Sequence, residues 1–164
     1  MHGRLAEIIV LDQFSRNLHR DSPLAFAQDN MAIALAQEAI KQPEFKNMTV
    51  RERHFMLMPL MHSESKVIHE QAVPLFEQFG PEESVDFELK HKVIIDRFGR
   101  YPHRNAVLGR ESSSEEIEFL TQPGSSFKIW SEKCGRNYSQ TRLLVCSPIG
   151  AVGKSQRSKK RCFL

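Results

Sequence analysis

The residue types best suited to chemistry gather between positions 97 and 112, around two glycines. This segment, the arginine turn, contains four arginines, one histidine and one asparagine: Arg97, Arg100, His103, Arg104, Asn105 and Arg110. Guanidinium groups form paired hydrogen bonds with carboxylate or phosphate oxygens. The arginine turn is therefore a candidate site for an anion, although its residue types specify no reaction.

Glycine and proline predict how the arginine turn is held. Gly99 can take the positive φ that ends a helix, and Pro102 disfavours a helical conformation of Tyr101. The arginines then project from the end of a helix. Two interpretations remain open: they bind a ligand, or they form an internal polar brace in which Arg97 caps the last helix carbonyls.

Polar residues elsewhere can join the arginine turn at one cleft between helices. Six further candidates lie on a flank of the first predicted helix and after the third: Asp12, Gln13, Arg16, Asn17, His62 and Glu64. An arginine-rich cleft in an apolar helical body suits a small anion or an acidic peptide end. The competing interpretation is that these groups pair with each other and hold the helices in register.

Two classes of function follow from this cleft. The first, which we favour, is a helical binding or scaffold module whose arginine-rich groove takes a small anion or an acidic peptide or protein partner. The alternative is a hydrolase-like enzyme that uses His62 or His103, with Glu64, for acid–base chemistry on an anionic substrate. Ser63 is a weak candidate nucleophile, because adjacent residues rarely point at one atom.

Histidines and cysteines predict no metal site, and we expect no cofactor. No two histidines have the close spacing of the H-E-x-x-H motif. The three cysteines, Cys134, Cys146 and Cys162, form no C-x-x-C pair, and their odd number argues against a closed disulfide framework. Reduced thiols in a cytoplasmic protein are the expectation.

The net charge of +3 sums two unlike parts of the 164 residues. Residues 128–164 contain nine Lys or Arg and one Glu, which leaves residues 1–127 with 14 basic and 19 acidic groups. The first part has no nucleic-acid signature, and the basic patch at 156–161 allows at most weak nucleic-acid binding. No run approaches the roughly 20 apolar residues of a membrane span, and the N-terminus is no signal peptide.

Apolar periodicity and capping residues predict helices along the first part. In a helix over residues 3–19, one apolar stripe is formed by Leu5, Ile8, Leu11, Phe14 and Leu18. Ser22-Pro23 begins an alanine-rich helix over 22–42. Thr49 and Glu52 form a capping box for a third helix, which Pro59 should kink or end.

The later helices lead into and out of the arginine turn. A fourth helix, with a bend at Pro74, and a fifth helix precede the turn, and Ser113 and Glu116 form a second capping box after it. No useful alternating strand pattern appears, so we predict an all-α domain of antiparallel helical hairpins over residues 1–127. Residues 128–164 lack periodicity and are predicted to form a disordered basic tail.

Several multi-residue motifs follow one another in a definite order. They are Gly3-Arg4-Leu5, Leu11-Asp12-Gln13-Phe14, Arg16-Asn17, Ala25-Phe26-Ala27, Glu52-Arg53, Pro59-Leu60-Met61-His62-Ser63-Glu64, and the segments 97–105, 108–112, 115–116 and 119–120. In this order they resemble the bacterial domain-of-unknown-function family DUF924 over about residues 3–127. The resemblance implies an all-helical fold of the tetratricopeptide-like class, with no established activity and no catalytic residues to assign.

Three features depart from the pattern of that family. The family usually has a further helical segment before the Gly3-Arg4-Leu5 helix, at which this chain almost begins. Ser15 stands where the family usually has proline, and the resemblance stops after Phe127. We therefore expect a truncated or mis-predicted gene product, whose first helix exposes an apolar patch where a packing partner is missing.

Overall fold

The structure, a computed structural model, describes residues 1–126, most of which lie in helices and short helical turns. The helices are α1 (His2–Ile9), α2 (Ser15–Leu18), α3 (Asp29–Ile40), α4 (Val50–Met61), α5 (Lys66–Phe79), α6 (Glu82–Phe98) and α7 (Ser114–Leu120). Between them lie a π-helical turn, η1 (Val10–Phe14), and three 3-10 turns, η2 (Pro23–Phe26), η3 (Pro43–Asn47) and η4 (Pro102–Arg104). No strand occurs in this part of the chain, which confirms the predicted all-α fold.

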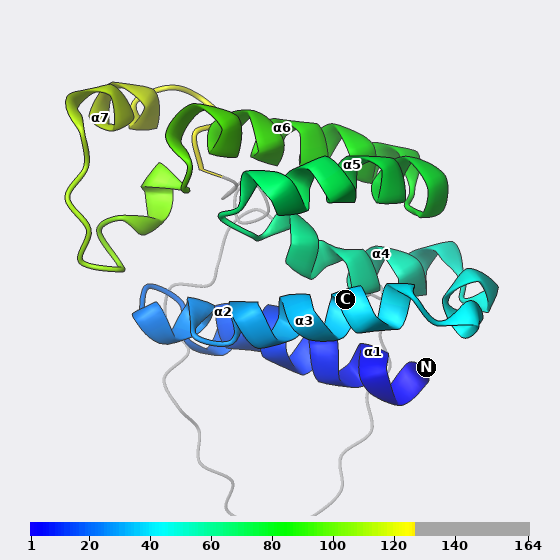
Figure 1. The fold of residues 1–164 in the computed structure, drawn as a ribbon. Coiled ribbons are helices and arrows are strands. Elements are labelled where there is room, and N and C mark those ends of the chain that lie inside the picture. Colours follow the sequence, from blue (N-terminus) through cyan, green and yellow to red (C-terminus); the bar gives the residue numbers. More distant parts are fainter. Residues whose placement is uncertain (127–164) are drawn as a thin grey trace, which may run out of the picture. The chain divides into compact units, whose positions relative to one another are not determined.

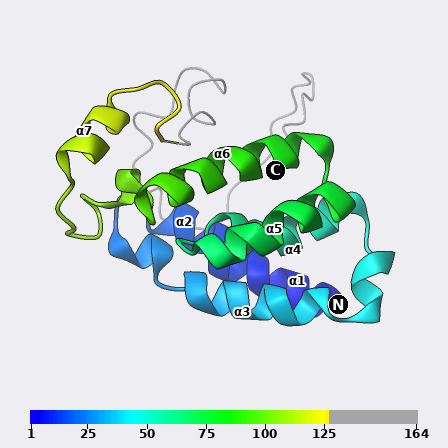
Figure 2. The same cartoon turned by 45° about the horizontal axis from the view of Figure 1, so that its top comes forward.

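Neighbouring helices pack as antiparallel hairpins (Figure 1). α1 packs on α3 and α4, α4 packs on α5, and α5 packs on α6. Four residues join α4 to α5 and two join α5 to α6, and connections this short place antiparallel helices side by side. Figure 2 shows the same succession from α1 and α3, through α4 and α5, to α6. The predicted hairpin arrangement is confirmed.

The main core lies where α1, α3, α4 and α5 meet. Its largest members, each at most 1% exposed, are Ile8, Phe45, Met56, Leu57 and Phe76. The alanine-rich helix contributes three buried alanines, Ala32, Ala36 and Ala39. Their small side chains let α4 approach α3 closely.

Local signals begin or end several helices where the sequence predicts. Thr49 and Glu52 form a capping box at α4, and Ser113 and Glu116 form one at α7. Gly99 ends α6 with a φ of 68°, a left-handed conformation that glycine adopts because it has no Cβ. Each of these ends depends on residues within one helical turn, so the sequence suffices to place it.

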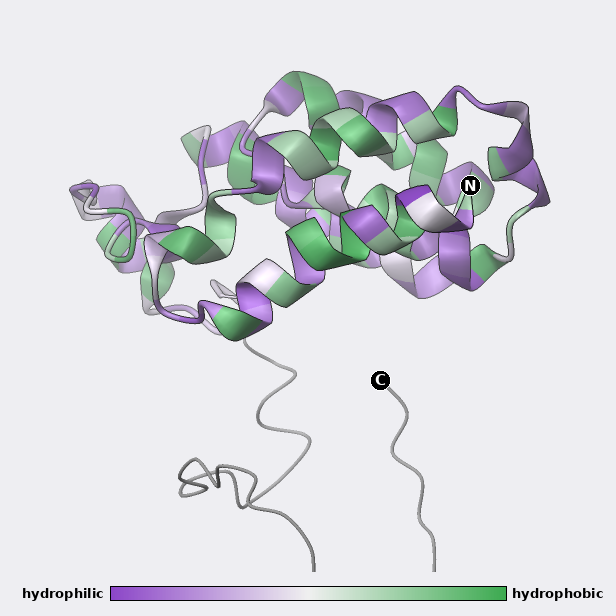
Figure 3. Cartoon of the chain, turned by 90° about the horizontal axis from the view of Figure 1, so that it is seen from below, coloured by the Kyte–Doolittle hydropathy of each residue, from purple (hydrophilic) through white to green (hydrophobic). Residues whose placement is uncertain are grey.

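The apolar stripe predicted on the first helix is wrong, because its members lie on two faces. Leu5 and Ile8 are buried in the core, whereas Phe14 and Leu18 are 52% and 76% exposed. Residues 10–14 form the π-helical turn η1, which has more residues per turn than an α-helix, so side chains at α-helical spacing before and within it do not share one face. Figure 3, a view from below, shows hydrophobic stretches along this helix, where Val10, Phe14 and Leu18 are exposed.

Two further helix boundaries differ from the prediction. Ser22 caps only the 3-10 turn η2, and α3 begins later, at Asp29. α4 does not end at Pro59 but continues to Met61. α5 runs through Pro74, as the prediction of one helix around this proline requires. A proline inside a helix removes one backbone hydrogen bond, and Pro59 is buried in the core, where tertiary packing stabilises the helix.

Residues 127–164 lie outside the described part of the chain, and with them the predicted disordered basic tail and its cysteines. The described residues belong to one unit, Met1–Phe127. None of their helices is long and apolar enough to cross a membrane. Every residue of the predicted cleft lies within this unit.

Candidate functional site

Backbone hydrogen bonds hold the arginine turn after α6 ends. The N–H of Leu108 donates to the carbonyl oxygen of Arg104 at 2.9 Å. The N–H of Arg110 donates to the carbonyl oxygen of Asn105 at 2.8 Å. The turn is thus a fixed loop that gives its side chains defined directions.

Glu64, in the connection between α4 and α5, joins that connection to the arginine turn. Its carboxylate accepts two hydrogen bonds from Arg110, at 2.6 and 3.0 Å, and one from the backbone N–H of Tyr101, at 2.8 Å. Burial raises the pKa of Glu64, but these bonds outweigh burial and lower the pKa below its ordinary value. Glu64 is therefore ionised at neutral pH and forms an ion pair with Arg110.

Replacing Glu64 with alanine is expected to lower the free energy of unfolding by about 2–3 kcal/mol, because Arg110 and the Tyr101 N–H both lose their partner. Urea denaturation followed by circular dichroism measures the change. Glu77→Ala, at an exposed position of α5, is the matched control and should be hard to distinguish from wild type. Equal effects of the two substitutions would contradict the role of Glu64 as a clamp.

Asp12 is a buried carboxylate in the π-helical turn η1, and it is 1% exposed. Its Oδ1 lies 2.7 Å from Nδ1 of His62 and 3.4 Å from Arg16, and Gln13 donates to its Oδ2. π-helical turns of this kind are frequent at functional sites. The contact with His62 joins the first helix to the end of α4.

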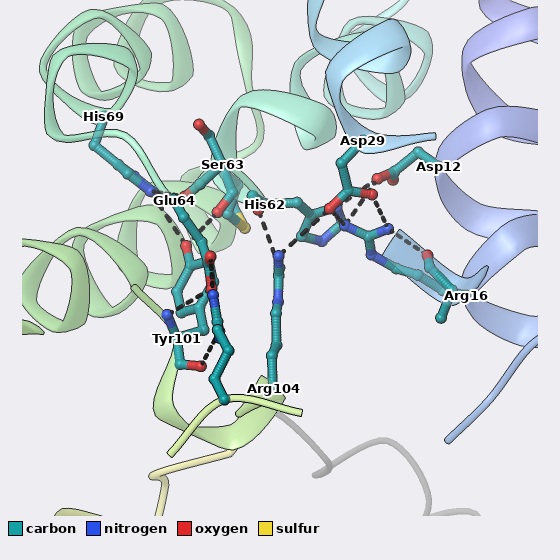
Figure 4. A network of polar contacts seen from close by, with 12 residues as sticks. Asp12, Arg16, Asp29, His62, Ser63, Glu64, His69, Tyr101 and Arg104 are labelled. Atoms are coloured by element: carbon teal, nitrogen blue, oxygen red, sulfur yellow. Dashed lines mark hydrogen bonds and ion pairs between the residues drawn. The ribbon is translucent and has the colours of Figure 1, made fainter. Parts of the chain in front are cut away.

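Asp29, at the first position of α3, pairs with two arginines from distant parts of the chain. It forms a bidentate pair with Arg16, at 2.7 and 2.9 Å, and a longer contact with Arg104, at 3.4 Å. Arg104 also donates to the backbone oxygen of His62 at 3.0 Å. We call Asp12, Arg16, Asp29, His62 and Arg104 the ionic network (Figure 4).

Arg104 is a buried cation whose hydrogen-bonding capacity is incompletely used. It is 6% exposed, and its guanidinium lies between the rings of Phe26 and Tyr101, 4.6 and 4.4 Å from their centroids. Its Nε is buried without a hydrogen-bond partner among the described residues. Burial lowers the pKa of Arg104, and nearby Arg16 adds to this effect, although a guanidinium remains protonated in proteins.

The charges of Asp12 and His62 decide where the proton between them lies. Burial raises the pKa of Asp12, but His62 and Arg16 outweigh burial and lower the pKa from 3.8 to about 2. Burial lowers the pKa of His62 below 6.5, although Asp12 opposes the change. At neutral pH Asp12 is thus ionised and His62 is neutral, so Nδ1 donates its proton to Asp12 and Nε2 carries none.

A cavity of about 260 Å³ lies beside the ionic network. Its polar lining comes from Asp29, Asn30, His62, Ser63, Glu64 and Arg104, and its apolar lining includes Phe26, Ile33 and Leu108. An apolar cavity with a few placed polar groups is typical of a small-molecule site. Among the described residues, no group of three or more His, Cys, Asp or Glu is placed to hold a metal ion.

A second polar cluster supports the arginine turn from inside the protein. The hydroxyl of Tyr101, which is 0% exposed, donates to the carbonyl oxygen of Met61 at 2.6 Å and lies 3.2 Å from Nε2 of His69. His69 also contacts Ser63 O at 2.9 Å and Glu88 Oε1 at 2.6 Å, and burial raises the pKa of Glu88. These bonds join α4, α5 and α6 to the turn.

The structure brings five of the predicted residues to the ionic network or its cavity: Asp12, Arg16, His62, Glu64 and Arg104. Gln13 contacts Asp12, while the side chain of Asn17 is exposed and donates to the carbonyl oxygen of Gln13 at 3.0 Å. His103 does not line the cavity, and its ring lies 5.4 Å from that of Tyr101. Arg110 reaches the site only through Glu64.

Two predicted residues, Arg100 and Asn105, point to the α7 side instead. Arg100 forms a bidentate pair with Glu116, at 2.7 and 2.8 Å. The amide of Asn105 donates to the hydroxyl of Ser112 at 3.0 Å. In this half of the arginine turn, the polar residues brace the chain that leads into α7.

Sequence reasoning missed Asp29, which pairs with both arginines of the ionic network. Its signal is weak, because an acidic residue in the first turn of a helix is commonly explained by the helix dipole alone. Tyr101 entered the prediction only as the residue before a proline, yet its side chain is fully buried. His69 and Glu88 offer no local sequence signal, because 19 residues separate them.

By its fold, this is an all-α protein of antiparallel helical hairpins, with a buried ionic network beside a small cavity. The family model described as "Bacterial protein of unknown function (DUF924)" matches residues 1–124. The chain belongs to this family, as its ordered motifs predict.

Among solved structures, the chain is similar to "Protein of Unknown Function ATU0120 from Agrobacterium tumefaciens", with 34% sequence identity and a TM-score of 0.67. The match covers 71% of this chain and 66% of that protein, so this chain spans about two thirds of its length. No curated protein matches the sequence. Neither the description of the family nor the name of the similar structure gives an activity.

Proposed function

We propose that this chain is a helical binding module that takes a carboxylate in the cavity beside the ionic network. The carboxylate belongs either to a small molecule or to the end of an acidic peptide. Arg104 supports this function most directly, because it is buried, lines the cavity and, within residues 1–126, has one carboxylate contact, the 3.4 Å contact with Asp29. Buried charges are normally paired and hydrogen-bonded, so a bound carboxylate would complete the pairing of Arg104.

Arg16 and Arg110 already have carboxylate partners, so Arg104 is the cation that we propose anchors the ligand. Arg16 is held by the bidentate pair with Asp29, and Arg110 is held by the bidentate pair with Glu64. Their role in the proposal is to keep the cavity walls in place. Phe26 and Leu108 would contact the carbon part of the ligand.

Isothermal titration calorimetry of the full chain tests the proposal with phenylacetate, inorganic phosphate, and an acidic peptide whose C-terminus is free or amidated. We expect phenylacetate to bind, and Arg104→Lys to weaken binding about tenfold or more, because an ammonium cannot reproduce the guanidinium fork. Arg97→Lys is the matched control: its exposed side chain pairs with Glu115 at 2.7 Å, away from the cavity lining. This control should bind as wild type does.

The probes separate the possible ligands. Binding of the free but not the amidated peptide identifies a peptide end, and binding of phenylacetate alone identifies a small molecule. Leu108→Trp, which fills the cavity without touching Arg104's charge, should also abolish binding. Binding of phosphate alone, binding of no probe, or unchanged affinity in Leu108→Trp would each overturn the carboxylate site.

A hydrolase-like enzyme is the second candidate, and the Asp12–His62 contact favours it. In such a reaction water would lose a proton to Nε2 of His62 while its oxygen attacks an ester carbonyl, and the alcohol would leave with a proton. Release of nitrophenol from the nitrophenyl monoester of succinate, lost in His62→Phe, would support this candidate. Capture of carboxylates without turnover would support the binding module.

The proposal also includes a cytoplasmic location. We propose nucleic-acid binding only as a weak interaction of the basic tail, residues 128–164, which lies outside the described residues. The acidic excess of residues 1–127 gives no support for nucleic-acid binding by the helical unit.

A further inference from the structure

The cavity combines a group that only donates hydrogen bonds with a group that can accept one. Arg104 has five N–H donors and no acceptor. His62 lines the same cavity, and its Nδ1 is already engaged by the ionised Asp12 at 2.7 Å. In a neutral ring held this way, Nε2 is an acceptor.

The two carboxylates of the cavity lining already accept hydrogen bonds from arginines. The two carboxylate oxygens of Asp29 accept from Arg16, at 2.7 and 2.9 Å. Both carboxylate oxygens of Glu64 accept from Arg110, at 2.6 and 3.0 Å. Among the ionisable side chains of the lining, Nε2 of His62 is therefore the acceptor left for a ligand, beside the uncharged amide of Asn30 and hydroxyl of Ser63.

We propose that the cavity selects hydroxycarboxylates, with Arg104 binding the carboxylate and Nε2 of His62 accepting a hydrogen bond from the ligand hydroxyl. This inference rests on the proposed carboxylate site and names its ligand class. A plain carboxylate satisfies Arg104 but offers no proton to Nε2. An amino acid is disfavoured, because its ammonium would lie beside the Arg104 cation while both nearby carboxylates are held by arginines.

The geometry of the ionic network places the proposed carboxylate-binding residue, Arg104, next to the proposed hydroxyl-binding residue, His62. Arg104 donates to the backbone oxygen of His62 at 3.0 Å, so the anchoring cation and the histidine are neighbours across the cavity wall. Asp12 fixes the histidine from the opposite ring nitrogen and is 1% exposed, so solvent does not compete for that contact. A hydroxyl on the carbon next to the carboxylate suits two groups this close together.

Mandelate and phenylacetate form the matched pair of probes, because they differ only by the hydroxyl. Calorimetry on the full chain near neutral pH is expected to give about five- to tenfold tighter binding of mandelate, the range of one hydrogen bond. His62→Phe, which keeps a ring but no acceptor, should bring the ratio of the two dissociation constants close to one. His62→Gln, whose amide oxygen accepts, should restore part of the preference.

The nitrogen chemical shift of His62 Nε2 in the wild-type chain gives a readout that needs no variant. Mandelate should shift it and phenylacetate should not. Equal affinity for both probes, an unmoved Nε2 resonance, or a preference that survives in His62→Phe would overturn the hydroxyl selectivity while leaving the carboxylate site intact. Binding of neither probe would instead overturn the proposed function on which the selectivity depends.

Discussion

Replacing Tyr101 with alanine is expected to lower the free energy of unfolding by about 3–5 kcal/mol. The ring is 0% exposed and lies in edge contact with His91, with centroids 5.7 Å apart, so its removal leaves a cavity in the core. The lost hydroxyl also leaves the buried carbonyl oxygen of Met61 without its 2.6 Å hydrogen bond. Urea denaturation followed by circular dichroism measures the change.

Two control variants separate the contributions to this effect. Tyr101→Phe keeps the ring and removes the hydroxyl, so about 1–3 kcal/mol should be lost. Phe14→Ala removes an aromatic residue that is 52% exposed and should cost less than Tyr101→Ala, because only about half of its surface leaves water on folding and no buried hydrogen bond is lost. A Tyr101→Ala chain as stable as Phe14→Ala would contradict the supporting role of the second polar cluster.

Replacing Asp12 with asparagine is expected to lower the free energy of unfolding near pH 7 by about 3 kcal/mol. The buried carboxylate contacts both His62 and Arg16, and neutralising it leaves these contacts without their anion. This loss is at the lower end of the range for breaking a buried ion pair, because Arg16 keeps its bidentate partner, Asp29. The same urea titration provides the value.

The Asp12→Asn substitution should also reduce the acid sensitivity of the protein. Burial opposes ionisation of Asp12, yet His62 and Arg16 lower its pKa in the fold from 3.8 to about 2. The unfolded chain therefore binds the proton more readily, so ionised Asp12 stabilises the fold above about pH 4, and this stabilisation is lost as the pH falls toward 2. The shift corresponds to about 2 kcal/mol.

Unfolding measured between about pH 5 and pH 3 compares the variant with wild type. Wild type should lose more stability over this interval than Asp12→Asn does, because the other carboxylates titrate in both chains. Glu7→Gln, in the preceding helix α1 with a side chain that is 60% exposed, is the control and should titrate as wild type does. Parallel pH profiles of wild type and Asp12→Asn would show that Asp12 is not the group held ionised by the network.

The sequence leaves open whether the arginine turn is a ligand site or an internal polar brace, and different arginines of the turn fit each interpretation. Arg100 pairs with Glu116 at 2.7 Å and supports the chain before α7. Arg104, four residues later, lines the cavity and lies between two aromatic rings. Neighbouring arginines of the turn thus face different partners, and substitutions within one motif should have different consequences.

The helical architecture follows from short-range signals that the sequence contains. The capping boxes of Thr49 with Glu52 and of Ser113 with Glu116, and the left-handed Gly99, are set by residues within one helical turn. Such signals hold in almost any tertiary setting. The helix at Ser22-Pro23 failed as a prediction because the same cap also suits a 3-10 turn.

The sequence by itself determined the all-α class, the hairpin order and the membership of the family, because helix periodicity, caps and ordered motifs are local properties of the chain. Only the tertiary structure decided which charges meet. Arg104 and Asp29 are 75 residues apart, and His62 and Asp12 are 50 apart. Ion pairs act through distance in space, and any of several carboxylates is chemically equivalent as a partner. Packing of the arginine turn against the region where α1, α3 and α4 meet brings these particular groups together and forms the cavity beside them.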